Sequence, residues 1–123
     1  MKFDDFLDLA KRLKDAEGAK EVEFRSSISR AYNYAFVLIK TRHRNDKRVT
    51  FSGREGDKGL VGQLLTYAKK RDLASQWRAF SSDRNSAEYD MDEKFEKDFA
   101  DEFVDDIESF ITELRNKVRV KVR

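Results

Sequence analysis

Three polar side chains of types suited to phosphate chemistry lie within the segment 84–90. Arg84 and Asn85 are adjacent, and Tyr89 follows them just before a long acidic segment. A planar guanidinium can bind a phosphate through two parallel hydrogen bonds and can stabilise the negative charge that develops when the phosphate is attacked. A neighbouring group that titrates can move the proton. We therefore take Arg84, Asn85 and Tyr89 as the candidate catalytic residues.

The spacing of Arg84 and Tyr89 constrains how the two side chains can meet. Five residues on an uninterrupted α-helix advance by about 500°, which places these side chains about 140° apart. They can share one face only if the helix ends between them. Asp90 and Glu93 resemble a capping box at the start of the next helix. The sequence therefore predicts a turn that folds Tyr89 back toward Arg84, so that both face one polar cleft.

Each of these residues also has a purely structural interpretation. Arg84 could interact with the last carbonyls of its own helix. Tyr89 could be a ring at the edge of the core with its hydroxyl in water, and Asn85 could end the helix. Tyr32 and Tyr34 are expected to be core residues that pack against the last helix. The sequence leaves the structural and functional interpretations of the 84–90 segment open.

The composition predicts an all-α fold. The chain has 123 residues, about the usual length of one domain, and residues 1–123 are expected to form a single domain because no Pro/Gly/Ser-rich segment divides them. Proline is absent, five residues are glycine and 41% are charged, whereas a β-sandwich or barrel needs many Gly and Pro turns. Hydrophobic residues make up 39%, including ten Phe, which is enough for a modest core.

Apolar residues recur at helical spacing, which predicts an antiparallel bundle of four to five helices. The segments at about 22–40 and 93–118 have the widest apolar faces and are expected to form the central pair. The periodicity fails over residues 41–57, which predicts a long loop whose conformation the sequence does not define. The remaining helices are expected from Phe3 to about Gly18, around Leu60 to Ala68, and from Asp72 through Trp77 and Phe80 to about Arg84.

Charge is unevenly distributed along the chain, although the net charge is only +2. Ten Asp or Glu residues lie within 90–108, whereas residues 40–48 contain five Lys or Arg. Such segregation predicts a basic surface for the phosphates of a nucleic acid. The alternative is that the charges only solvate exposed helix faces. The residues assigned to nucleic-acid binding are Arg84, Arg42, Arg44 and Arg48.

Cysteine is absent, and His43 is the single histidine. Disulfides and thiolate metal sites are therefore excluded, and we expect neither a cofactor nor a metal ion. His43 follows the central helix in a basic segment and is expected to be solvated. No segment approaches the roughly 20 apolar residues that a spanning helix needs, and no secretory leader is recognisable. A cytoplasmic protein without a membrane partner is expected.

Two segments of the chain resemble the signature motifs of the HEPN superfamily, small helical proteins of which many are RNA-cutting toxins. The first is 24–36, which contains Arg25 and Arg30, and the second is the Arg-Asn-x-Ala-x-Tyr-Asp sequence of 84–90. The family's usual second motif has a histidine five positions after the arginine, where this chain has Tyr89. The resemblance implies a HEPN-like bundle in which Arg25 and Arg30 are mainly architectural.

The resemblance also implies an activity and partners. In the family, the arginine and histidine converge in a cleft, commonly at a dimer interface, and cut RNA without a metal. Tyrosine loses its proton far less readily than histidine near neutral pH. The resemblance therefore implies either a weak or inactive metal-independent endoribonuclease, or a protein that only binds RNA or a nucleotide.

A homodimer from a toxin–antitoxin or phage-defence system is expected on the same basis, with an antitoxin or nucleotidyltransferase as its partner. In the family, such a transferase modifies a tyrosine two residues past the motif histidine. The corresponding position here is Met91. This modification therefore does not carry over to the present chain.

A second class of function fits the acidic last helix. The chain could be a non-catalytic helical adaptor or dimerisation module that binds a protein partner through this helix and has no role with nucleic acid. RNA binding that weakens steeply with salt would separate the two hypotheses, since phosphate contacts release counterions.

Overall fold

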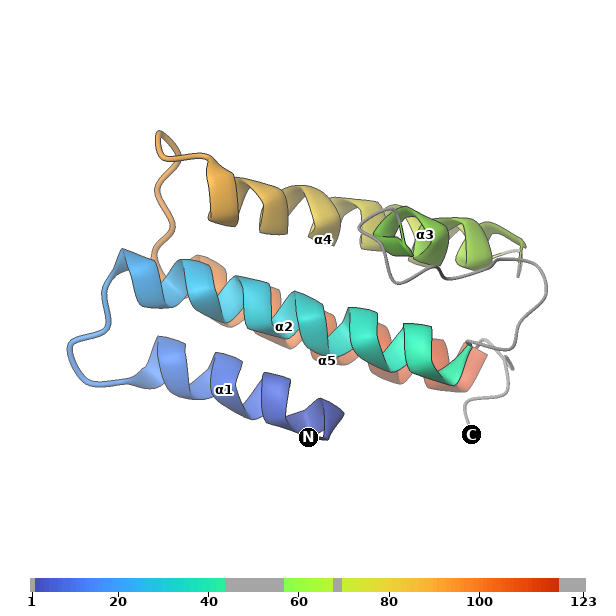
Figure 1. Cartoon of the computed structure of the whole chain (residues 1–123), viewed down its shortest axis with the longest axis horizontal. Coiled ribbons are helices and arrows are strands. Elements are labelled where there is room, and N and C mark those ends of the chain that lie inside the picture. Colours follow the sequence, from blue (N-terminus) through green and yellow to red (C-terminus); the bar gives the residue numbers. More distant parts are fainter. Residues whose placement is uncertain (1, 44–56, 68–69, 118–123) are drawn as a thin grey trace.

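The chain is a bundle of five helices in the computed structural model, which describes residues 2–43, 57–67 and 70–117 (Figure 1). No strand occurs in these three ranges. The all-α fold predicted from the composition is confirmed. The helices are α1 (Phe3–Asp15), α2 (Glu21–Arg42), α3 (Asp57–Tyr67), α4 (Arg71–Tyr89) and α5 (Lys97–Lys117).

Helix α2 lies at the centre of the bundle, because it contacts each of the other four helices. Helices α1 and α4 flank α2 and run antiparallel to it, whereas α5 lies along α2 in the same direction (Figure 1). The short helix α3 packs mainly against α4. The two helices predicted to form the central pair, α2 and α5, therefore pack together. They run parallel, so the antiparallel arrangement predicted for the bundle does not hold for this pair.

The apolar stripe of α5 lies in the core, which explains the strong periodicity of its sequence. Phe103 is 3% exposed, Leu114 is 1% exposed, and Ile107 and Phe110 are fully buried. Burying each of these side chains stabilises the fold by about 1.5–3 kcal/mol relative to leaving it in water. The residues between them on the outer face are mainly acidic, so a single helix provides both core and solvated surface.

Helix α1 is attached to both central helices. Ser27 Oγ of α2 donates a 2.7 Å hydrogen bond to the carbonyl of Ala10, and both residues are fully buried, so α1 and α2 approach closely there. Lys14 of α1 forms an ion pair of 2.8 Å with Asp101 of α5. The connection between α1 and α2 turns at Gly18, whose φ of 74° favours glycine. This agrees with the predicted end of the first helix.

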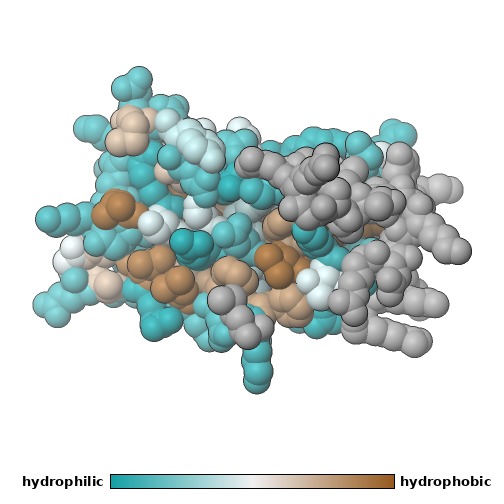
Figure 2. Space-filling model, viewed as in Figure 1, coloured by the Kyte–Doolittle hydropathy of each residue, from teal (hydrophilic) through white to brown (hydrophobic). Residues whose placement is uncertain are grey.

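The surface is largely hydrophilic over α4, and hydrophobic side chains gather in a broken band over α1 and α2 on the face shown in Figure 2. Within the described ranges, no helix is both long enough and apolar enough to cross a bilayer.

The connection between α4 and α5 differs from the sequence prediction. Helix α4 continues through Tyr89 and does not end soon after Arg84. Asp90 does act as a local cap, because its carboxylate accepts hydrogen bonds from the backbone N–H groups of Asp92 (3.0 Å) and Glu93 (3.2 Å). These bonds form a turn, and α5 begins only at Lys97. The prediction that Asp90 and Glu93 start the last helix was therefore wrong by one helical turn.

Arg25 holds this connection against the first turn of α2. Its guanidinium donates to the carbonyl oxygens of Ser86 (3.3 Å), Ala87 (3.0 Å) and Glu93, and lies 4.9 Å from the centroid of the Phe95 ring. The last carbonyls of a helix lack the usual partner within the helix. The Ser86 carbonyl also accepts from the Asp90 N–H at 2.9 Å, so the arginine adds a second bond there and supplies a donor to the Ala87 carbonyl. This agrees with the architectural role expected for Arg25.

Replacing Arg25 with Ala should lower the free energy of unfolding by about 2–4 kcal/mol, because several charge-assisted hydrogen bonds and a cation–π contact are lost together. Urea denaturation followed by circular dichroism measures the change. The matched control is Arg30→Ala. The resemblance implied an architectural role for Arg30 as well, but this residue is exposed, so its replacement should change the stability by less than about 0.5 kcal/mol. Equal effects of the two substitutions would contradict the role given to Arg25.

Candidate functional site

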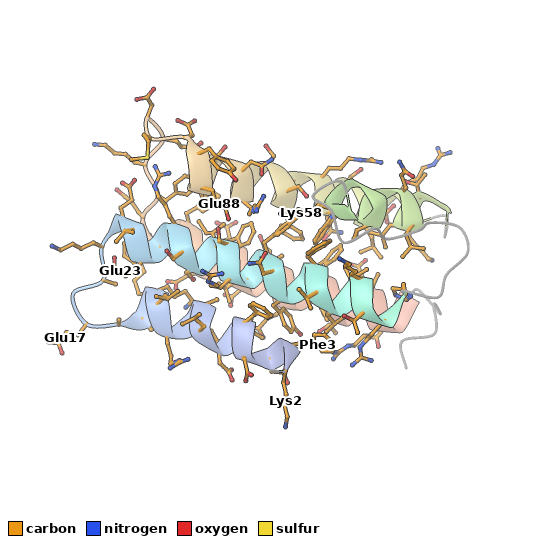
Figure 3. All side chains as sticks on the ribbon, in the orientation of Figure 1. Lys2, Phe3, Glu17, Glu23, Lys58 and Glu88 are labelled. Carbon is orange, nitrogen blue, oxygen red and sulfur yellow. The ribbon has the colours of Figure 1, made fainter. Side chains whose placement is uncertain are left out.

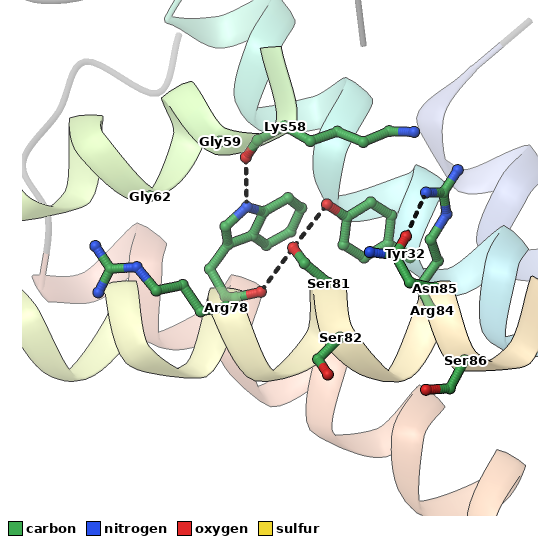
Figure 4. A pocket seen from close by; sticks show the side chains of 11 residues that line it. Tyr32, Lys58, Gly59, Gly62, Arg78, Ser81, Ser82, Arg84, Asn85 and Ser86 are labelled. Atoms are coloured by element: carbon green, nitrogen blue, oxygen red, sulfur yellow. Dashed lines mark hydrogen bonds between the residues drawn. The ribbon is translucent and has the colours of Figure 1, made fainter. Parts of the chain in front are cut away.

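A pocket of about 590 Å³ lies between α2, α3 and α4, and its lining combines polar and apolar groups (Figure 4). Three of its residues are cationic, and no carboxylate is among the described residues that line it. Such a lining suits an anion that needs both charge and hydrogen bonds. The lining residues are Tyr32, Lys58, Gly59, Gly62, Trp77, Arg78, Ser81, Ser82, Arg84, Asn85 and Ser86.

Trp77 forms the inner wall of the pocket. It is 1% exposed, and its ring stacks on that of Tyr32 with 4.6 Å between centroids and on that of Phe110 with 6.0 Å. Its Nε1–H donates a 2.9 Å hydrogen bond to the carbonyl oxygen of Lys58. A buried indole N–H needs such an acceptor. This bond fixes the first turn of α3 against α4 and so places Lys58 at the pocket.

Tyr32 connects α2 to the same wall. Its hydroxyl lies 2.9 Å from Ser81 Oγ, and Ser81 Oγ donates to the carbonyl of Trp77 at 3.0 Å. The hydrogen of Ser81 is thereby used, so Tyr32 is the donor in the bond between the two hydroxyls. Burial raises the pKa of Tyr32, against smaller opposing effects of Ser81 and Arg84. Tyr32 therefore stays protonated at neutral pH. As expected it is a core residue, and its ring stacks on Trp77 of α4.

Arg84 lies in the pocket and is only 8% exposed. Its guanidinium carbon is 5.5 Å from the centroid of the Tyr32 ring, and Nη1 donates a 3.0 Å hydrogen bond to Asn85 Oδ1. The buried Nε is 3.2 Å from Glu88 Oε1, an ion-pair distance, but it has no partner in hydrogen-bond geometry. Ser29 Oγ donates to the same carboxylate oxygen at 2.7 Å. Glu88 extends from α4 toward α2 (Figure 3), and its ion pair with Arg84 holds the guanidinium in place.

The structure brings two of the three predicted catalytic residues together. Arg84 and Asn85 line the pocket, whereas Tyr89 is 69% exposed and lies in a shallow surface hollow with Asn85, Ser86 and Asp90. Because α4 is helical through Tyr89, its side chain is rotated about 140° from that of Arg84. The prediction that Arg84 and Tyr89 face one cleft was therefore wrong within a single chain. The carbonyls that Arg84 was expected to bind in the structural alternative are bound by Arg25 instead.

The predicted basic segment contributes nothing that can be placed in this pocket. Arg42 belongs to the last turn of α2, is partly buried, and is not among the lining residues. Arg44 and Arg48 lie outside the described residues. His43, expected to be solvated, is 4% exposed because it is packed at the C-terminal end of α2.

Sequence reasoning missed Lys58 and Arg78. Arg78, Ser82 and Asn85 stand at i, i+4 and i+7, a polar stripe beside the apolar stripe of α4, and this periodicity could have identified Arg78. Lys58 reaches the site only because Trp77 holds α3 against α4. A contact of that kind between distant segments leaves no local signal in the sequence.

Over the ranges that the structure describes, no group of three His, Cys, Asp or Glu side chains is placed to hold a metal ion. Comparison with protein-family models, with curated proteins and with solved structures gave no match to this chain.

Asp83 precedes Arg84 and should make stability depend on pH. Burial raises the pKa of Asp83 above its ordinary value, and the charge of Glu93 raises it further. The folded chain then binds this proton more tightly than the unfolded chain, so the stabilising contribution is present in acid and is lost as pH rises through the folded pKa. Asp83→Asn, which cannot ionise, should therefore unfold at higher urea concentration than wild type at about pH 7, and the gain should vanish toward about pH 3. The control is Asp105→Asn on the exposed face of α5, which should not show this pH-dependent gain. If Asp83→Asn is less stable than wild type at neutral pH, the predicted direction of the change is contradicted.

Proposed function

We propose that this chain binds the phosphate groups of RNA or of a nucleotide in the pocket beside Arg84, and that it does so without cleaving the ligand. The supporting observation is the convergence of Lys58, Arg78 and Arg84 from two helices on one pocket. Serine hydroxyls and the Asn85 amide supply further hydrogen bonds beside these charges. Guanidinium and ammonium groups with neutral donors are the usual protein ligands of phosphate.

The proposal keeps the HEPN-like character suggested by the two sequence segments. It is supported by the all-helical bundle, by the architectural contacts of Arg25, and by the position of Arg84 in a polar pocket. A homodimer and a role in a toxin–antitoxin or defence system belong to the same proposal. An antitoxin or nucleotidyltransferase would then be the protein partner.

Binding is favoured over catalysis because no suitable base is among the described residues that line the pocket. Cleavage of RNA through its 2′ hydroxyl needs a group that exchanges a proton near neutral pH. No histidine or carboxylate is among the described lining residues, and burial keeps Tyr32 protonated. Tyr89 is exposed on another side of α4.

The adaptor alternative is favoured by one specific feature of α5. Asp101 and Glu108 are used in ion pairs with lysines of α1, whereas Asp98, Glu102 and Asp105 are exposed. This leaves an acidic face that suits a basic protein partner. An adaptor of this kind should show no RNA binding at any salt concentration, whereas phosphate binding should weaken steeply as salt rises.

Substitution of the pocket arginines should weaken RNA binding. In a gel shift at about 50 mM salt with single-stranded RNA, Arg84→Gln should raise Kd by about tenfold or more, since a charge-assisted contact is worth about 1.5–3 kcal/mol. Arg78→Gln, at an exposed position that folding does not need, should raise Kd severalfold. The matched control is Arg12→Gln on the exposed side of α1. If all three variants bind like wild type, the pocket is not the binding site.

Introducing the family's usual histidine should not create a nuclease. Tyr89→His places an imidazole about 140° around α4 from Arg84, out of reach of a phosphate held there. Labelled RNA incubated with wild type or Tyr89→His should remain intact. If either protein cleaves the RNA, and the additional substitution Arg84→Gln in that protein abolishes cleavage, the non-catalytic assignment is contradicted.

A further inference from the structure

Among the described residues that line the pocket, no aromatic face is open for a nucleobase to stack on. Tyr32 is fully buried and Trp77 is 1% exposed, and their rings cover one another. Phe110 and Phe36 pack against the same indole at centroid distances of 6.0 Å and 6.5 Å. Base stacking on aromatic side chains is the usual sequence-tolerant contribution to binding of single strands. Its absence from the described lining means that the phosphate groups, and not the bases, carry recognition.

The cationic groups are spread along the pocket. Figure 4 shows Lys58 and Arg84 extending to one side of the pocket and Arg78 to the other, with Ser81 and Ser82 between them. Cations on both sides suit an elongated anion that carries several adjacent charges better than they suit a single phosphate.

The charge of the lining also favours a ligand with several charges. An internal phosphodiester carries a single negative charge, whereas a terminal phosphate alone carries about −1.5 to −2. A terminal di- or triphosphate carries more again over a short length. Three cationic side chains line this one pocket without a carboxylate among the described lining residues, and they match the more highly charged ligand.

Two further features point to an anion. The first turn of α3, with Lys58 and Gly59, borders the pocket, and the N-terminus of a helix carries partial positive charge and free N–H groups. Independently, Arg84 is only 8% exposed in the pocket, and Glu88 and Asn85 hold its guanidinium in place. A cation that is fixed and largely withdrawn from water interacts with an anion more strongly than a solvated one.

We infer that the pocket binds a terminal polyphosphate, the di- or triphosphate of a free nucleotide or of the 5′ end of an RNA, in preference to an internal phosphodiester and without preference for the base. This inference rests on the proposed function and specifies the ligand of the same site.

Isothermal titration at about 0.15 M salt, with the full chain, tests the inference. The probes are inorganic tripolyphosphate, ATP, UTP, AMP and adenosine. ATP and UTP should bind with Kd values within about threefold of each other and of tripolyphosphate. AMP should bind at least about tenfold more weakly, and adenosine should not bind. Lys58→Gln and Arg78→Gln should each weaken ATP binding severalfold, and Arg12→Gln should leave it unchanged.

RNA oligonucleotides of one sequence with a 5′-triphosphate or a 5′-hydroxyl distinguish the two sources of the ligand. If 5′-triphosphate RNA and ATP bind with similar Kd values, the phosphate chain alone is the ligand. If 5′-triphosphate RNA binds more tightly than ATP, the ligand is the 5′ end of an RNA. If 5′-hydroxyl RNA binds equally well and both RNAs are weakened by Arg78→Gln, the inference is overturned while the proposed function stands. If no phosphate compound binds, both fail. A preference above tenfold between ATP and UTP also overturns the inference.

Discussion

The stacking of Trp77 on Tyr32 is the contact on which the candidate site depends. The two rings join α4 to α2, and the indole N–H joins both to the first turn of α3. The same indole packs on Phe110 of α5, so the wall of the pocket is continuous with the core. Because these rings occupy fully buried positions, the polar side chains in front of them are held on a rigid support.

Two arginines of the chain are used in opposite ways. Arg25 directs its N–H groups at backbone carbonyls and at Glu21, and so closes one end of the bundle. Arg84 is anchored by Glu88 and Asn85, and its position in the pocket leaves it beside Lys58 and Arg78. Burying a charge costs several kcal/mol unless it is paired. The ion pair with Glu88 offsets that cost and holds the guanidinium in place.

The parts of the structure that follow from local pattern could be predicted from the sequence. The periodicity of α2 and α5 located both helices and predicted that they pack together, although not that they run parallel, and the helix of Trp77 and Phe80 was correctly extended to Arg84. The position of Tyr89 was predicted wrongly because α4 continues through Tyr89 and Asp90 caps a turn, not a helix. Arg25, from a distant segment, binds a carbonyl of that turn.

Local sequence pattern also could not predict the full set of residues that line the pocket. Lys58 comes from a helix whose placement depends on a hydrogen bond to Trp77, and Arg78 is recognisable as a lining residue only once α3 is known to face it. The sequence thus indicated the type of chemistry around Arg84, while the set of side chains available for that chemistry depends on packing between α2, α3 and α4.

Trp77 is the single tryptophan of the chain and forms the wall of the pocket, so its indole N–H reports directly on the site. The central claim is that phosphate groups bind beside Arg84. In ¹H–¹⁵N spectra recorded while tripolyphosphate is added, the Trp77 Nε1–H resonance should shift and saturate, and Arg78→Gln should move saturation to higher concentration. An indole resonance that stays fixed while resonances elsewhere saturate would show that phosphate binds at another surface and would contradict the claim.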